Sequence, residues 1–184
     1  MALGDTSSVG PDGQSVAVRT WGDEVGTWVV AANKATCSVL AGGIGITTVD
    51  TGTINVVMQG TLTRAGNEVS IILRYVDADN YIRAIHDGTN MKLIKRVAAA
   101  ETDVISAVVA LGAGAVVVVG DGTAFSLYLN NAQVGATSTI SDAALQTGTR
   151  QGLFTTNVGN TFDNFLVFPR GSGGEFAALN KWSN

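Results

Sequence analysis

The sequence predicts an all-β protein, and three observations support that prediction. Short runs rich in Val, Ile and Thr alternate with Gly, Asn and Asp turns along the chain. Charged residues make up only 14% of the 184 residues and Gly contributes 23, which argues against a helical bundle with a charged surface. No segment keeps a 3.6-residue hydrophobic period. We therefore expect one antiparallel β-sandwich or barrel of about a dozen strands.

Residues 53–64 give the clearest strand of the first half. Their sequence, TINVVMQGTLTR, puts Met58 and Leu62 on one face and Gln59 on the other, which is typical of a half-buried strand. Further strands and Asp- or Asn-rich turns follow this segment: strands 69–76, 81–86 and 91–97, with turns at 77–80 and 87–90.

Residues 104–120 carry no charge over 17 positions, a length at the lower limit for a membrane span. Three Gly interrupt the run, and β-branched residues dominate its second half, so we expect two buried strands joined by a turn at 111–114. The rest of the second half reads in the same style, with strands at 124–129, 133–139, 152–157 and 161–168 and one helical turn at 141–146.

Four motifs, in this order, resemble those of concanavalin A-like (laminin G-like) jelly-roll domains. They are GTWVV at 26–30 with NKA at 33–35, ILRYVDADNY at 72–81, VVVGD at 117–121 with FSLYLN at 125–130, and GL at 152–153 with FDNF at 162–165. The resemblance implies an antiparallel two-sheet sandwich, which we place at residues 15–169. Because GQS at 13–15 precedes the first motif, the chain further resembles the kind of jelly-roll domain found in bacteriophage structural proteins.

The predicted fold places eight side chains between or beside the two sheets. These are Trp28, Met58, Leu73, Leu93, Val117, Leu127, Leu153 and Phe165.

Charge and rare residues exclude several functions. The net charge is -4 and no basic stripe exists, which argues against nucleic acid or an anionic membrane as a partner. Cys37 is the single cysteine, so neither a disulfide within the chain nor a zinc site of several thiolates can form. We expect the single histidine, His86, to be a structural residue of its strand.

The sequence predicts no enzyme. Glycosidases with this sandwich present their catalytic carboxylates as Glu-x-Asp-x-x-Glu on one strand. The chain has four Glu residues, and none of them lies in such a motif. The hydrolase activity of the family is therefore not expected here.

Three aromatic residues are candidates for stacking against a sugar ring: Trp21, Tyr75 and Tyr81. Trp21 lies in the polar segment RTWGDE and is the hardest to explain as core, whereas packing within the sandwich is the alternative for all three. Near them, Asp77, Asp79 and Asn80 could supply oxygen ligands to Ca²⁺. We favour a turn stabilised by its own side chains, because these residues offer fewer oxygens than calcium needs, and we expect no cofactor.

The two ends of the sequence are expected to lie outside the sandwich, as an N-terminal arm at 1–14 and a segment at 170–184. The latter begins with the Gly-rich linker RGSGG. Phe176, Leu179 and Trp182 follow at spacings of three, which favours an extended or helical docking tail that contacts another subunit, either a second copy or a coat protein. Folding back onto the same sandwich is the alternative.

We interpret the sequence as a non-enzymatic structural or decoration protein of a phage capsid or tail, located in the virion and forming a homo-oligomer there. No signal-peptide pattern is visible at residues 1–14, so synthesis in the host cytoplasm is expected. The alternative is a carbohydrate-binding module that recognises a host or environmental polysaccharide. A virion domain could also bind a glycan, so the two interpretations are compatible.

Overall fold

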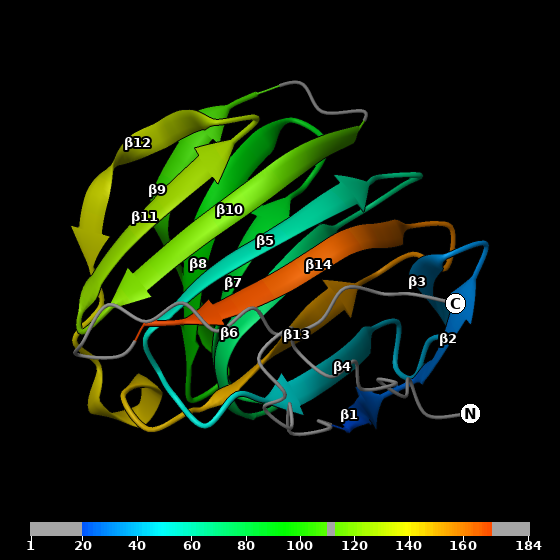
Figure 1. Cartoon of the computed structure of the whole chain (residues 1–184), viewed down its shortest axis with the longest axis horizontal. Coiled ribbons are helices and arrows are strands. Elements are labelled where there is room, and N and C mark those ends of the chain that lie inside the picture. Colours follow the sequence, from blue (N-terminus) through cyan, green and yellow to red (C-terminus); the bar gives the residue numbers. More distant parts are fainter. Residues whose placement is uncertain (1–19, 110–112, 171–184) are drawn as a thin grey trace, which may run out of the picture.

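The computed structural model describes residues 20–109 and 113–170, which form two antiparallel sheets of seven strands each, packed face to face (Figure 1). We call β1-β4-β13-β6-β7-β8-β9 the first sheet and β12-β11-β10-β5-β14-β3-β2 the second sheet. In chain order the strands are β1 (Trp21–Val25), β2 (Thr27–Ala31), β3 (Lys34–Val39), β4 (Gly45–Asp50), β5 (Val56–Thr63), β6 (Val69–Asp77), β7 (Asn80–His86), β8 (Asn90–Val97), β9 (Ala100–Val108), β10 (Ala113–Asp121), β11 (Ala124–Leu129), β12 (Ala132–Thr139), β13 (Arg150–Thr155) and β14 (Thr161–Pro169). The predicted all-β sandwich is confirmed.

The core lies between the two sheets and contains seven of the eight residues predicted for it. Trp28, Met58, Leu73, Leu93, Leu127, Leu153 and Phe165 are all buried there. Along β5, buried and half-buried residues alternate without interruption, as the sequence pattern predicts.

The prediction for Val117 is wrong by one residue. Val116 and Val118 point into the core and pair across the sheet with Gly60 and Met58, so Val117 lies on the opposite face and is half-buried. The cause is the run of four valines at 116–119, which has no polar alternation to mark the inward face.

The centre of the first sheet is buried on both faces. Nearly every residue of β6 and β7 is buried, whereas β5 and β10 of the second sheet alternate. Val69, Ile71 and Leu73 of β6 belong to the core, so Ser70 and Ile72 point away from the second sheet and are nevertheless buried. This outer face of the first sheet carries the candidate site.

Several sequence predictions concern connections and ends. A 3-10 turn at Ala143–Leu145 confirms the helical turn predicted at 141–146. Strands β9 and β10 confirm the two strands predicted within 104–120, but β9 is largely exposed rather than buried, because it is an edge strand. The turn predicted at 111–114 is wrong for its last two residues, which belong to β10. Residues 110–112, the arm at 1–14 and the tail with Phe176, Leu179 and Trp182 lie outside the described residues.

No helix in the described part of the chain is long and apolar enough to span a membrane.

Candidate functional site

A second apolar cluster covers the middle of the outer face of the first sheet. Along β7, Ile82 and Ala84 point into the core, so Tyr81 and Arg83 point outward. Tyr81 packs there with four residues from β4, β6 and β13: Ile46, Ile72, Tyr75 and Phe154. Four neighbouring strands therefore build this cluster, which we call the aromatic floor.

Tyr75 and Tyr81 stack on each other in this cluster, with ring centroids 6.1 Å apart and an interplanar angle of 18°. They are only 7% and 3% exposed, and this burial raises the pKa of both phenols. The prediction that these two rings offer open faces to a sugar is therefore wrong. The structure brings them together as a buried pair that supports the polar groups beside it.

Trp21 is likewise a core residue, which corrects the prediction of an exposed ring in a polar loop. It begins strand β1, is 2% exposed, and packs edge-on against Phe165 at a centroid distance of 5.3 Å. The polar residues that follow it, Asp23 and Glu24, are the exposed part of this edge strand. Asp23 and Glu24 are polar because they lie at the edge of the sheet, and their polarity does not indicate the direction of the Trp21 side chain.

Asp77, Asp79 and Asn80 form the turn between β6 and β7. Asp77 Oδ1 accepts hydrogen bonds from the Asp79 backbone N–H at 2.8 Å and from Asn80 Nδ2 at 2.9 Å. The Asp79 N–H, followed by the side chain of Asn80, lowers the pKa of Asp77. No group of potential metal ligands was found among the described residues. The Asp77 carboxylate thus closes the turn, as in the favoured interpretation of this segment.

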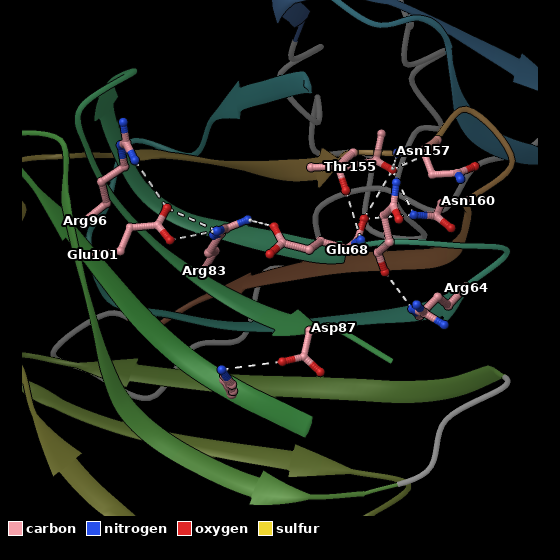
Figure 2. A network of polar contacts seen from close by, with 12 residues as sticks. Arg64, Glu68, Arg83, Asp87, Arg96, Glu101, Thr155, Asn157 and Asn160 are labelled. Atoms are coloured by element: carbon pink, nitrogen blue, oxygen red, sulfur yellow. Dashed lines mark hydrogen bonds and ion pairs between the residues drawn. The ribbon is translucent and has the colours of Figure 1, made fainter. Parts of the chain in front are cut away.

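Arg83 is the centre of a polar network on the outer face (Figure 2). Its Nη1 donates to Glu68 Oε2 at 2.8 Å, and its Nη2 donates to both carboxylate oxygens of Glu101 at 3.0 Å. The guanidinium lies over the ring of Phe154, 4.3 Å from the centroid. Arg83 is only 4% exposed, whereas the side chains of Glu68 and Glu101 are 35% and 36% exposed. A buried cation thus holds two accessible carboxylates.

The backbone of Glu68 is fixed by residues that follow β13. Its N–H donates to Thr156 Oγ1 at 2.9 Å, and its carbonyl accepts from Asn160 Nδ2 at 2.8 Å. Asn160 is fully buried, and its Oδ1 accepts from the backbone N–H groups of Ala65 and Gly66. Asn160 therefore holds the whole turn that leads to Glu68, and with it the carboxylate that faces Arg83 (Figure 2).

Glu101 reaches the network from the edge strand β9, where Arg96 holds it from the other side. Arg96 Nη1 lies 3.3 Å from Glu101 Oε1, and Arg96 Nη2 lies 3.4 Å from Asp79 Oδ1. Its Nε donates to the carbonyl of Ala78, and its guanidinium lies 5.8 Å from the centroid of the Tyr81 ring. This second arginine joins the β6–β7 turn to the Arg83 network.

Two further ion-pair clusters flank the aromatic floor. On one side Arg150 bonds Glu24 and Thr48, and on the other Lys92 lies between Asp87 and Asp103. Together the ion pairs of this face contain four basic side chains, Arg83, Lys92, Arg96 and Arg150, and six acidic ones, Glu24, Glu68, Asp79, Asp87, Glu101 and Asp103. The face is therefore rich in charge but mildly acidic.

Two buried polar atoms of this face have no hydrogen-bond partner within the described protein: Ser70 Oγ and Arg83 Nε. Ser70 lies two residues after Glu68 and on the same face of β6, where it pairs across the sheet with Phe154. The third such atom, Trp28 Nε1, belongs to a residue of the core. Native proteins leave few buried polar groups unsatisfied. Of the three described here, one belongs to Arg83 and another to Ser70, whose cross-strand partner Phe154 lies under the Arg83 guanidinium.

The arrangement suits the binding of a ligand rich in hydroxyl groups. Carboxylate oxygens accept hydrogen bonds and cannot donate them when ionised. Glu68 and Glu101 present such oxygens at fixed positions, since each is held by an arginine and by its strand or turn.

No sequence pattern predicted the four residues that form this network: Arg83, Glu68, Glu101 and Asn160. A signal for Arg83 is present in the sequence, because an arginine interrupts the apolar strand YIRAIH and a buried arginine needs acceptors. Nothing in the sequence shows that those acceptors come from residues 68 and 101. That pairing depends on the register of β6, β7, β8 and β9.

Comparison with solved structures supports the fold. The carbohydrate-binding module CBM66 from Bacillus subtilis superposes with a TM-score of 0.67 at 18% identity, over 80% of this chain and 94% of that chain. A putative glycosyl hydrolase from Parabacteroides distasonis gives a TM-score of 0.54 at 10% identity, over 82% and 99% of the two chains. A functionally unknown protein from Saccharomyces cerevisiae gives 0.52 at 11% identity, over 84% and 97%.

No protein-family model and no curated protein matches the sequence. The structural neighbours are β-sandwiches of the carbohydrate-binding-module and glycosyl-hydrolase-like kind, which agrees with the resemblance to jelly-roll lectin and glucanase domains. They give no support to the predicted phage link, virion location or homo-oligomer, which stay predictions.

Proposed function

We propose that the chain is a carbohydrate-binding domain that takes its glycan on the outer face of the first sheet. The observation that carries this proposal is the buried guanidinium of Arg83 with two accessible carboxylates, Glu68 and Glu101, fixed on either side of it. The likeness to a carbohydrate-binding module adds support at the level of the fold.

We further propose that this domain binds without catalysing hydrolysis. Glycosidases need two carboxyl groups that face each other across the glycosidic bond. Here Arg83 lies between Glu68 and Glu101 and bonds both of them, so a guanidinium occupies the space that a scissile bond would need. Absence of reducing-end release from any glycan that binds tests this part of the proposal.

The test of binding is a glycan array followed by titration calorimetry on the strongest hit. The double variant Glu68→Gln, Glu101→Gln keeps the side-chain volume but weakens both acceptors, and we expect it to lose at least tenfold in affinity. Asp142→Asn is the matched control, because Asp142 is a similarly exposed carboxylate, 29%, in an ion pair with Lys95 away from this face. Equal loss in both variants, or no binding by the unaltered protein, would contradict the proposal.

A location on a phage particle is compatible with glycan binding and stays a separate prediction. Mass spectrometry of purified particles tests it, and absence of the chain from such particles would leave the binding proposal intact.

A further inference from the structure

We infer that the site selects uncharged glycans and excludes those that carry carboxylate or sulfate groups. The inference rests on the proposed function, because it names the class of ligand that the same site accepts.

The cations in the ion pairs of this face are engaged by the protein itself, and Arg64 Nε of the same network donates to the carbonyl of Asn67. Arg83 is 4% exposed, and its Nη1 and Nη2 already donate to Glu68 and Glu101. Arg96 bonds Glu101 and Asp79, and Arg150 bonds Glu24. An anionic sugar would have to break one of these ion pairs to gain a bidentate arginine contact, which is the contact that makes arginine a good carboxylate or sulfate receptor.

The accessible atoms of the site are acceptors. Arg83 binds Oε2 of Glu68, and in the described part of the chain no donor is placed on Oε1. Glu101 is more than one third exposed although two arginines hold it. A ligand must therefore donate hydrogen bonds, which sugar hydroxyl groups do and an ionised uronate or sulfate group cannot do.

The charge balance acts in the same direction. Six acidic and four basic side chains form the ion pairs of this face, and Arg64 of the same network adds a fifth basic group. Acidic groups still outnumber basic ones, so a ligand anion meets net repulsion at short range. Neutral hydroxyl groups donate hydrogen bonds without this penalty.

The test compares each neutral oligosaccharide that binds with its counterpart in which the primary alcohol is oxidised to a carboxylate. We expect the oxidised form to bind at least tenfold more weakly to the unaltered protein at low ionic strength. We expect the ratio of neutral to oxidised affinity to fall severalfold in Glu68→Gln, because that variant removes one repelling charge. Asp142→Asn should leave this ratio unchanged. Raising the salt concentration should narrow the ratio without weakening neutral binding.

The outcomes separate the inference from the proposed function. Equal or tighter binding of the oxidised form overturns the inference and leaves glycan binding in place. A ratio that Glu68→Gln does not change also overturns it, since the selection then arises elsewhere. Absence of binding to every glycan overturns both.

Discussion

Two buried arginines of the same sheet hold opposite kinds of partner. Arg74, in β6, is fully buried and donates to three neutral acceptors, the carbonyls of Ile54 and Gly122 and the side-chain oxygen of Gln146. Its guanidinium lies 4.7 Å from the centroid of the Phe125 ring. Arg74 therefore joins three segments that are far apart in the sequence, and desolvation lowers its pKa.

Arg83, in β7, also lies over a phenylalanine ring, but its partners are the carboxylates of Glu68 and Glu101. The acceptors of Arg74 belong to the protein's own loops, whereas the acceptors of Arg83 remain one third exposed. Burial alone thus does not distinguish Arg74 from Arg83. The exposure of their acceptors does, because only Glu68 and Glu101 remain open to solvent.

The largest expected effect tests the structural half of this comparison. Arg74→Met removes the cation and leaves the Ile54 and Gly122 carbonyls and the Gln146 amide without their donor. We expect the free energy of unfolding to fall by about 3 kcal/mol, since each unsatisfied buried group costs about 1–3 kcal/mol. Denaturant unfolding measures this loss. Glycan affinity per folded molecule should stay unchanged, and a loss of affinity would erase the distinction between the two arginines.

The second expected effect tests the functional half. Arg83→Met should lower the free energy of unfolding by only about 2 kcal/mol, because the partly exposed Glu68 and Glu101 regain water when the ion pairs are lost. Affinity should fall at least tenfold, because the two carboxylates lose their fixed positions. Denaturant unfolding and glycan titration measure the two effects. Arg83→Met should reduce affinity more than stability, whereas Arg74→Met should reduce stability and leave affinity unchanged. Arg170→Met is a control for loss of a surface cation. Arg170 follows β14, and its substitution removes an ion pair with Asp121, the last residue of β10.

The two arginines also show how far the sequence could predict this protein. Alternation along segments such as 53–64 predicted strands, because period-2 burial is a local property, and the jelly-roll fold expected from the motifs placed seven of eight core residues correctly. The candidate site was not predictable in the same way. Trp21 and Tyr75 were chosen for their ring chemistry, whereas the structure buries both of them.

The reason lies in long-range register. Glu68 and Glu101 meet at Arg83 only because β6, β7, β8 and β9 are neighbours in one sheet with a defined pairing. Arg74 faces Ile54 and Gln146, which lie 20 and 72 residues away along the chain. A sequence pattern marks an arginine in an apolar strand as unusual, but it does not say which carbonyl or carboxylate that arginine will meet.

A smaller expected effect concerns acid. Desolvation raises the pKa of Asp87, but hydrogen bonds from the Asn90 and Thr89 backbone N–H groups and contacts of Asn90 and Lys92 lower it well below its ordinary 3.8. A depressed folded-state pKa stabilises the protein above pH about 4 and loses that contribution as the pH falls below it. We therefore expect unfolding free energy to fall between pH 4 and 2, by about 1 kcal/mol for this partly exposed group.

Asp87→Asn should remove that part of the pH dependence and keep the turn, since an amide oxygen still accepts from Thr89 and Asn90. Unfolding followed by circular dichroism at several pH values measures both slopes. Equal slopes in the variant and the unaltered protein would show that Asp87 does not contribute. Arg74 has only neutral hydrogen-bond acceptors, so acid should affect the outer face of the first sheet before it affects the Arg74 contacts.

The smallest change separates stability from binding most cleanly. Ser70 Oγ is buried and has no partner among the described residues, so Ser70→Ala removes an unsatisfied hydroxyl group. Stability should be unchanged or rise by up to about 1 kcal/mol, because such a group costs free energy where it is. Affinity should nevertheless fall severalfold if the hydroxyl completes its hydrogen bonding with the ligand, directly or through a water molecule. Trp28→Phe removes the unpaired indole N–H of the core and serves as the control, with a change in stability but none in affinity. A Ser70→Ala variant that is more stable and binds equally well would place the ligand away from Arg83, and the comparison between the two arginines would then reduce to one of stability.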